Sequence, residues 1–325
     1  MTTPHIGLLT SGGDVPGLNA AIRAVVRAGV FYQIPITGIQ RGYEGLIDQD
    51  FIELTSGAVS HIIHKGGTIL QSSRSSRFLE PNYRQIAYEN LHQRGITHLI
   101  LIGGDGSMRG ALQIANENNI SVIGIPKTID NDISGTDYAI GFDTATNIAM
   151  EAIDRIRDTA QSHHRLFFVE VMGRNAGYIA LQTGIATGAE GIIIPETNRD
   201  LQLLFEVIER KKNWKTSSYI VVVAEGDEIG GAYHLEQLIK HKYPHIYTGV
   251  SILGHIQRGG SPTCADRVLA TRLGVAAVEA ILQDQNNIMV GMINQTIRHT
   301  PLAQVSNRKL TIDKNLTQLL QILAH

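Results

Sequence analysis

The stretch His98-Leu-Ile-Leu-Ile-Gly-Gly-Asp-Gly-Ser107 is an apolar run that ends in a glycine-rich acidic turn. A second run, Ser121-Val-Ile-Gly-Ile-Pro-Lys-Thr-Ile-Asp-Asn-Asp132, follows it and also ends in carboxylates. Near-continuous apolar runs of this length are typical of buried parallel strands. Open α/β sheets bind ligands at the carboxyl ends of their strands. The two runs therefore predict an α/β protein with a ligand site at these turns.

Alternation of strands and helices continues along the whole chain. Strands are expected at 6–10, 34–39, 166–171, 191–195, 218–224 and 250–253, a hairpin at 288–301, and helices at 19–30, 83–93, 143–157, 201–212 and 265–282. A short helix is expected at 61–63, and Tyr43 is expected in a loop. Many of the 33 glycines fall at strand-to-helix junctions. This placement favours a doubly wound α/β protein, and the length of 325 residues favours two domains.

Bulk composition narrows the classes of function. The formal net charge of −2 gives no reason to expect nucleic acid or an anionic membrane as a partner. Cys264 is the one cysteine, which excludes an intrachain disulfide and fits a reducing compartment. The chain begins without a signal-peptide pattern and contains no apolar run of membrane-spanning length. We expect a cytoplasmic protein.

The two acidic turns indicate phosphoryl transfer. In the first turn, glycines allow backbone amides to approach a phosphate chain, and Asp105 is suited to Mg²⁺. In the second, Asp130 is a candidate general base, and Asp132 either helps to organise the metal or orients the loop. The turn at 11–17 lacks the glycine spacing of a dinucleotide fingerprint, so NAD binding is disfavoured.

Cations at strand ends support the same interpretation, because phosphoryl transfer requires neutralisation of charge. Arg74, Arg165, Arg174 and Arg258 lie in polar turns or beside strand ends, where arginine can bind phosphate. His255 shares the turn of Arg258 and is a candidate phosphosugar contact. Glu225 follows a strand and serves either sugar hydroxyls or a helix N-cap.

Five segments together resemble the 6-phosphofructokinase family, from Ile6 to about Leu282. They are Leu8-Leu-Thr-Ser-Gly-Gly-Asp14, Ile102-Gly-Gly-Asp-Gly-Ser107, Pro126-Lys-Thr-Ile-Asp-Asn-Asp132, Val169-Glu-Val-Met-Gly-Arg174 and Leu253-Gly-His-Ile-Gln-Arg-Gly-Gly-Ser-Pro262. The resemblance implies two doubly wound, Rossmann-like, three-layer domains with mainly parallel sheets. It places a phosphoryl-donor domain at 1–141 plus 257–305 and a sugar-phosphate domain at 142–256 plus 306–325. The implied reaction is phosphorylation of the 1-hydroxyl of fructose 6-phosphate by ATP and Mg²⁺.

The resemblance also assigns roles to individual residues. Asp130 would be the base, assisted by Thr128 and Arg174, and Asp105 and Asp132 would serve the metal. The donor site would comprise Gly13, Tyr43, Arg74, Gly104, Asp105, Gly106 and Ser107. The sugar site would comprise Thr128, Ile129, Asp130, Arg165, Met172, Gly173, Arg174, Glu225, His255 and Arg258. Arg165 would reach the 6-phosphate from a neighbouring subunit, which implies a homotetramer.

Two positions bear on the choice of phosphoryl donor. Lys127 resembles the pyrophosphate-dependent branch of the family, whereas Gly106 leaves the room that a nucleotide needs. We expect ATP, with a pyrophosphate-dependent enzyme as the alternative. A non-catalytic sugar-phosphate sensor is the alternative from another class, but it would be expected to lack Asp130 or Asp105, and both are present.

Two further departures from the family concern sites between subunits. Gly249 stands where the family has a second phosphate-binding arginine. Arg23, Arg27, Arg157 and Glu190 match part of an effector site. ADP and phosphoenolpyruvate are therefore expected as candidate effectors.

Overall fold

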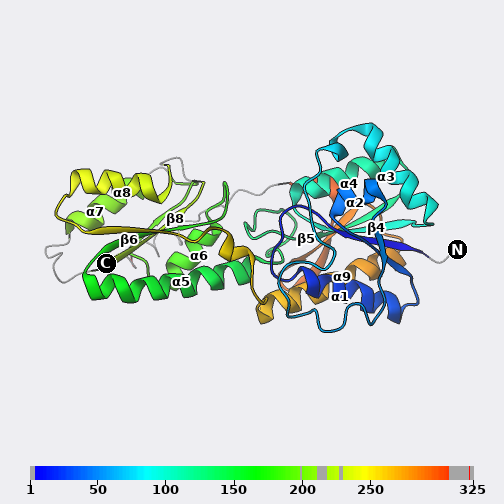
Figure 1. Cartoon of the computed structure of the whole chain (residues 1–325), viewed down its shortest axis with the longest axis horizontal. Coiled ribbons are helices and arrows are strands. Elements are labelled where there is room, and N and C mark those ends of the chain that lie inside the picture. Colours follow the sequence, from blue (N-terminus) through cyan, green and yellow to red (C-terminus); the bar gives the residue numbers. More distant parts are fainter. Residues whose placement is uncertain (1–3, 198–199, 211–217, 227–229, 307–321, 323–325) are drawn as a thin grey trace. The chain divides into compact units, whose positions relative to one another are not determined.

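The computed structural model describes residues 4–197, 200–210, 218–226, 230–306 and 322 (Figure 1). Backbone contacts divide the chain into two compact units. Of the described residues, unit 1 contains 4–129, 133–143 and 258–306, and unit 2 contains 130–132 and the described part of 144–257. Most of the 306–325 segment, expected in the sugar-phosphate domain, lies outside the described residues.

Unit 1 is built on a mainly parallel sheet. Its strand order is β11-β10-β5-β4-β1-β2-β3 in the described chain. The bounds are β1 Ile6–Thr10, β2 Ile36–Ile39, β3 Phe51–Glu53, β4 His98–Gly103, β5 Ser121–Pro126, β10 Ile288–Ile293 and β11 Thr296–Pro301. The pairs β2–β3 and β10–β11 at the edges are antiparallel, and the inner pairs are parallel. The expected strands at 98–102 and 121–125 and the expected hairpin at 288–301 are confirmed.

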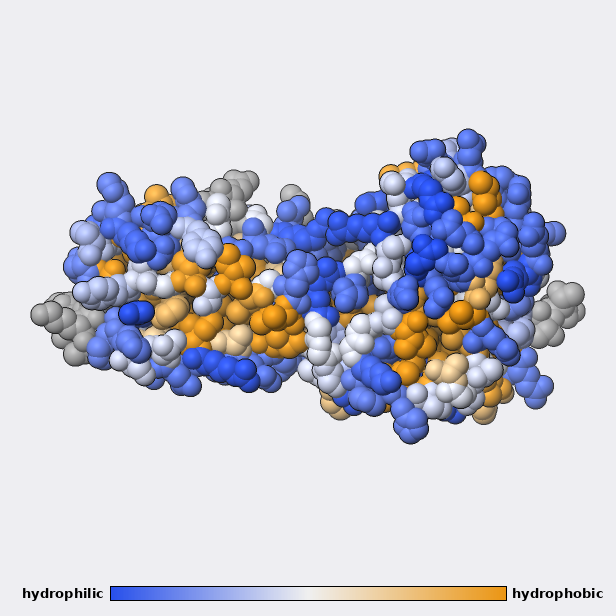
Figure 2. Space-filling model, viewed as in Figure 1, coloured by the Kyte–Doolittle hydropathy of each residue, from blue (hydrophilic) through white to orange (hydrophobic). Residues whose placement is uncertain are grey.

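Helices cover both faces of this sheet, with α1 and α9 on one face and α2, α3 and α4 on the other (Figure 1). The bounds are α1 Leu18–Phe31, α2 Gly42–Asp48, α3 Pro81–Gln93, α4 Asp105–Glu117 and α9 Cys264–Leu282, with a 3₁₀ turn η1 at Arg77–Leu79. A Cβ added at Gly274 of α9 would lie only 2.6 Å from the Cβ of Ala24 in α1. Small residues therefore allow α1 and α9 to pack closely. Figure 2 shows apolar residues gathered over α1 and α9.

Unit 2 has a fully parallel four-stranded sheet of order β7-β8-β6-β9 among the described residues. The strands are β6 Leu166–Val171, β7 Gly191–Ile193, β8 Tyr219–Ala224 and β9 Thr248–Ile252. The helices are α5 Phe142–His163, α6 Tyr178–Ala186, α7 Asp200–Arg210 and α8 Gly231–Lys242, and the 3₁₀ turn η3 spans Gly254–Arg258. Buried side chains of β6 and β8 pack against α7 and α8.

Three local expectations differ from the structure. Tyr43 lies in α2 rather than in a loop. No helix forms at 61–63, where His61 has a positive φ of 57°. The glycine-rich turn after β4 is shorter than expected, because Asp105, Gly106 and Ser107 already belong to the first turn of α4. In the described part of the chain no helix is both long and apolar enough to cross a membrane.

Candidate functional site

The two acidic turns meet at one edge of the unit 1 sheet. β4 and β5 pair in parallel, and Gly103 at the end of β4 is opposite Pro126 at the end of β5. The Lys127 amide donates a 3.0 Å hydrogen bond to the Gly103 carbonyl, so the register persists past the strand ends. Because α4 begins at Asp105, its first amides and the positive end of its dipole lie at this edge. The edge suits an anionic ligand.

Asp105 has the features of a metal ligand. Its side chain is buried, and its Oδ2 forms an ion pair with Arg109 Nη1 at 2.5 Å. Its buried Oδ1 has no hydrogen-bond partner among the described residues. A carboxylate oxygen buried without a partner is costly unless a ligand supplies positive charge. No cluster of three or more His, Cys, Asp or Glu suited to a metal occurs among the described residues. Mg²⁺ fits this arrangement, because it commonly uses one or two carboxylates together with phosphate oxygens and water.

Gly104 and Gly106, beside Asp105, leave the edge open. A Cβ at Gly106 would meet only Arg109 Nη2, at 3.9 Å, and a Cβ at Gly104 would meet only the Lys127 carbonyl, at 3.6 Å. Gly106 is exposed. Among the described residues, a Cβ at either position would therefore make only ordinary van der Waals contacts.

The loop after β1 packs beside this helix start. Ser107 Oγ donates a 2.9 Å hydrogen bond to Ser11 Oγ, and Ser72 Oγ donates a 2.6 Å bond to the Gly12 carbonyl. The buried Lys127 donates from Nζ to the Gly13 carbonyl. Three separate segments of the chain thus hold this loop, which carries the predicted donor-site residue Gly13.

Tyr43 of α2 supports the same first turn of α4. Burial raises the pKa of its hydroxyl, so the group stays protonated, and it donates a 2.6 Å hydrogen bond to the Ser107 carbonyl. Its ring stacks on Phe78 of η1 with 3.8 Å between ring centroids. The Tyr43 side chain is only 5% exposed. Its role in this structure is support of α4, and Phe78 is a neighbour that sequence reasoning missed.

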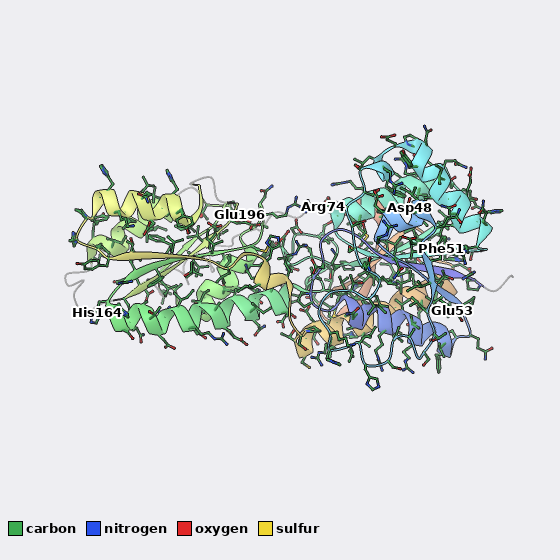
Figure 3. All side chains as sticks on the ribbon, in the orientation of Figure 1. Asp48, Phe51, Glu53, Arg74, His164 and Glu196 are labelled. Atoms are coloured by element: carbon green, nitrogen blue, oxygen red, sulfur yellow. The ribbon has the colours of Figure 1, made fainter. Side chains whose placement is uncertain are left out.

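Two nearby arginines differ in their surroundings. Arg74 is exposed on unit 1 and forms no ion pair within the described residues (Figure 3). Arg77 Nε donates a 2.8 Å hydrogen bond to Glu44, and its Nη1 lies 3.0 Å from Asp48 Oδ1. Hydrogen bonds from Arg77 lower the pKa of both carboxyls. Arg74 is therefore the arginine available to a ligand, whereas Arg77 fastens η1 to α2.

Arg258 lies against the loop after β1. Its Nε donates a 3.1 Å hydrogen bond to the Asp14 carbonyl, and its guanidinium occupies the space that a Cβ at Gly13 would need. A side chain at position 13 would therefore displace the Arg258 guanidinium from this place. The structure thus places Arg258, a predicted sugar contact, beside the predicted donor-site residue Gly13.

The second acidic turn is buried and carries an unusual backbone conformation. Asp130 is 8% exposed, and Asn131 adopts a left-handed φ of 51°. Ile129 is also buried, and the Thr128 amide donates a 3.2 Å bond to the Ile140 carbonyl. Asp132 is half-buried and belongs with Asp130 to unit 2, whereas Asp105 belongs to unit 1.

In unit 2, β6 and β8 end beside one another. The turn after β6 has positive φ angles at Gly173 and Arg174, and the Arg174 amide donates a 3.0 Å hydrogen bond to Glu225 Oε1 at the end of β8. Arg174, Glu225 and His255 are all exposed, and Met172 is half-buried. The predicted sugar-site residues Met172, Gly173, Arg174 and Glu225 are therefore brought together at one sheet edge.

Arg165 lies at the opposite end of β6 from Arg174. It immediately precedes β6 and is exposed, and its neighbour His164 marks this end of the unit in Figure 3. The six residues of β6 separate Arg165 from the turn after the strand, a span of about 20 Å. Arg165 therefore cannot join Arg174 around one small ligand within the same chain.

Gly249 has a steric explanation in this structure. It lies opposite Phe167 in the β6–β9 pair, and a Cβ at position 249 would be 2.6 Å from Phe167 Cε1. The Phe167 ring therefore occupies the space that a side chain at position 249 would need.

The candidate effector residues fall into two groups. Arg157 Nη1 pairs with Glu190 at 3.2 Å, and its Nη2 donates to the Thr187 and Gly188 carbonyls. Arg23 and Arg27 lie on α1 of unit 1. Arg157 and Glu190 are thus paired within unit 2, and Arg23 and Arg27 lie four residues apart on one helix of unit 1.

Comparisons with known proteins agree with the motifs. The family model described as Phosphofructokinase matches residues 5–281. An ATP-dependent 6-phosphofructokinase 1 from Thermus thermophilus is 51% identical over 98% of this chain and 99% of its own length. An ATP-dependent 6-phosphofructokinase 2 from Bacteroides thetaiotaomicron is 49% identical over 99% of each chain. A solved phosphofructokinase from Saccharomyces cerevisiae aligns with a TM-score of 0.84 and 32% identity, covering 93% of this chain and 44% of that one.

Proposed function

The chain belongs to the phosphofructokinase family, and from that premise we propose that it transfers a phosphoryl group from ATP to the 1-hydroxyl of fructose 6-phosphate. The products are ADP and fructose 1,6-bisphosphate, as in the committed step of glycolysis. The observation that carries the proposal is the near-full-length identity of about half the residues to enzymes named for this activity. The open first turn of α4 around Gly106 supports a nucleotide as the donor.

Unit 1 supplies the groups for the donor. Asp105 would hold Mg²⁺ through its partnerless buried Oδ1, and the bound ion would neutralise charge on the donor phosphates. The first amides of α4, with Gly104, Gly106 and Ser107, would bind phosphate oxygens. Arg74, exposed and without an ion pair among the described residues, would add a charge-assisted contact. Gly13 and Tyr43 would shape this site, and Tyr43 would do so through Ser107.

Unit 2 supplies most of the groups for the acceptor, and unit 1 adds Thr128, Ile129 and Arg258. Asp130 would accept the proton of the 1-hydroxyl as its oxygen attacks the terminal phosphorus and ADP leaves. Thr128 and Arg174 would contact the transferring group, and Asp132 would assist the metal. Met172, Gly173, Glu225 and His255 would hold the sugar, together with Ile129 and Arg258. We assign unit 1 as the donor domain and unit 2 as the sugar-phosphate domain.

The assembly and its regulation are also proposals. The position of Arg165 at the far end of β6 supports a role toward a neighbouring subunit and hence a homotetramer. The Arg157–Glu190 pair, with Arg23 and Arg27, is proposed as part of an effector site for ADP or phosphoenolpyruvate. We keep the cytoplasm as the proposed location.

A pyrophosphate-dependent reaction is the less favoured alternative, because Lys127 is engaged with the Gly13 carbonyl and the relatives above are named ATP-dependent. Initial rates with fructose 6-phosphate, Mg²⁺ and either ATP or pyrophosphate distinguish the two donors. Activity with ATP alone is expected. Activity with pyrophosphate alone would reject the proposed donor, and sugar-phosphate binding without turnover would favour a non-catalytic sensor.

A further inference from the structure

The Asp105 carboxylate is already paired with a cation of the protein itself. Arg109 lies one helical turn after Asp105 in α4, and its Nη1 is 2.5 Å from Asp105 Oδ2. The two side chains differ in exposure, with 65% exposed for Arg109 and 6% for Asp105. A nearly buried carboxylate is thus neutralised by a guanidinium that reaches it from solvent.

The pairing uses only one of the two carboxylate oxygens. Oδ1 is buried and has no hydrogen-bond partner in the part of the chain that the structure describes. A guanidinium can occupy both oxygens of a carboxylate with two parallel hydrogen bonds, but here the only ion pair recorded for Asp105 in the described chain is made through Oδ2. The arrangement therefore leaves a coordination position on the carboxylate while its charge is balanced.

We propose that Arg109 is the counter-ion of Asp105 in the metal-free protein. A divalent cation displaces Arg109 from Asp105, and the Arg109 guanidinium then binds the phosphates of the donor. The counter-ion role rests on the Asp105 geometry alone, whereas the phosphate-binding role also rests on the proposed function. A divalent cation beside Asp105 repels the guanidinium, and Arg109 can leave at small cost because its own side chain is mostly exposed while the cation takes over the charge of the buried carboxylate. The guanidinium also lies beside the open Gly106, at the helix start suited to phosphate.

The proposal predicts opposite effects on two ligands when Arg109 is replaced by methionine. Arg109→Met removes the competitor of the cation, so Mn²⁺ alone binds about two- to fivefold more tightly, the range that an exposed ion pair provides. The same change removes a phosphate contact, so the KM for ATP rises. Arg298→Met is the matched control, because Arg298 is exposed on β11 and forms no ion pair within the described residues.

Three measurements test the proposal on the full-length protein. Paramagnetic resonance gives the affinity for Mn²⁺ without nucleotide, thermal unfolding with EDTA or Mg²⁺ gives the metal-dependent shift in Tm, and initial rates give the KM for ATP. Arg109→Met is expected to show tighter Mn²⁺ binding, a lower Tm in EDTA and a larger rise in Tm with Mg²⁺ than wild type or Arg298→Met. Asp105→Asn should abolish the Mg²⁺-dependent shift.

The outcomes distinguish the counter-ion role of Arg109 from its phosphate-binding role. Unchanged or weaker Mn²⁺ binding by Arg109→Met, relative to Arg298→Met, would overturn the counter-ion role. An unchanged KM for ATP with tighter Mn²⁺ binding would overturn the transfer of Arg109 to the phosphates. Inactivity of the wild type with ATP, together with tighter Mn²⁺ binding by the variant, would instead reject the proposed function and leave the counter-ion role standing.

Discussion

The Tyr43 hydroxyl donates a 2.6 Å hydrogen bond to the main-chain carbonyl of Ser107. This bond joins α2 to the first turn of α4, where Asp105 and Gly106 also lie. Because Phe78 covers the Tyr43 ring, the Tyr43 hydroxyl is directed to a protein partner and stabilises the first turn of α4. The first turn of α4, proposed above to bind phosphate, thus depends on a side chain that is itself buried.

Replacing Tyr43 with phenylalanine should therefore loosen this helix start. Loss of one hydrogen bond is expected to lower the free energy of unfolding by about 0.5–1.5 kcal/mol and to raise the KM for ATP. Urea unfolding and initial rates measure the two effects. Tyr88→Phe is a suitable control, since the half-buried Tyr88 hydroxyl forms no hydrogen bond with the described residues. Equal behaviour of the two variants would show that the Ser107 bond does not order the donor site.

Removal of the Asp130 carboxylate should affect turnover far more than binding. Asp130→Asn is expected to lower kcat by about 10²–10⁴-fold, because a positioned base acts mainly in the transition state. Calorimetric titration with fructose 6-phosphate should show an affinity close to that of wild type. Asp158→Asn, an exposed change on α5, serves as the control. Near-normal kcat in Asp130→Asn would remove this residue from the mechanism.

Lys127→Met should disturb the donor loop while keeping the apolar stem of the side chain. The lost charge-assisted bond to the Gly13 carbonyl should lower the free energy of unfolding by about 1.5–3 kcal/mol, and the loosened loop should raise the KM for ATP. Lys65→Met, at an exposed position, should leave KM unchanged. If Lys127→Met also had an unchanged KM for ATP, its bond to Gly13 would have no part in donor binding.

Restoring an arginine at position 249 should be unfavourable in this chain. Gly249→Arg places a Cβ against the Phe167 ring, and overpacking of this kind is expected to lower the free energy of unfolding by about 1–3 kcal/mol. Phe167→Ser should relieve the conflict in the double variant. A double-mutant cycle from urea unfolding measures the coupling between the two positions. Additive effects would contradict the steric explanation of Gly249.

Acid should weaken the fold at the amino end of the unit 1 sheet. Burial lowers the pKa of His5 and of His98 below the ordinary value of 6.5, so both bind a proton less readily in the folded state. Their contribution to stability is intact above that value and is lost as the pH falls through 6.5 toward the folded pKa values. Urea unfolding at about pH 7.5 and 5.5 should show a smaller acid-induced loss for the His5→Gln/His98→Gln double variant than for wild type. An equal loss would show that these two histidines do not carry the effect.

Local sequence patterns were sufficient for the elements that dominate the fold. Runs such as 98–102 and 121–125 are apolar on both faces and therefore identify buried parallel strands. The prediction of a loop at Tyr43 was wrong, because burial against α3 and η1 stabilises a short helix there. Arg109 follows Asp105 at the spacing of an i, i+4 ion pair, and this signal was present in the sequence.

The sequence by itself determined the fold class, the family and the chemical types at the candidate site, because strand and helix periodicity and residue type are local properties of the chain. Only the tertiary structure decided which groups are already engaged. It showed Lys127 bonded to Gly13, Arg77 held by Glu44, and Asp105 left with one buried oxygen without a partner. These pairings join segments far apart along the chain or depend on side-chain burial, and both are set by packing of the whole unit.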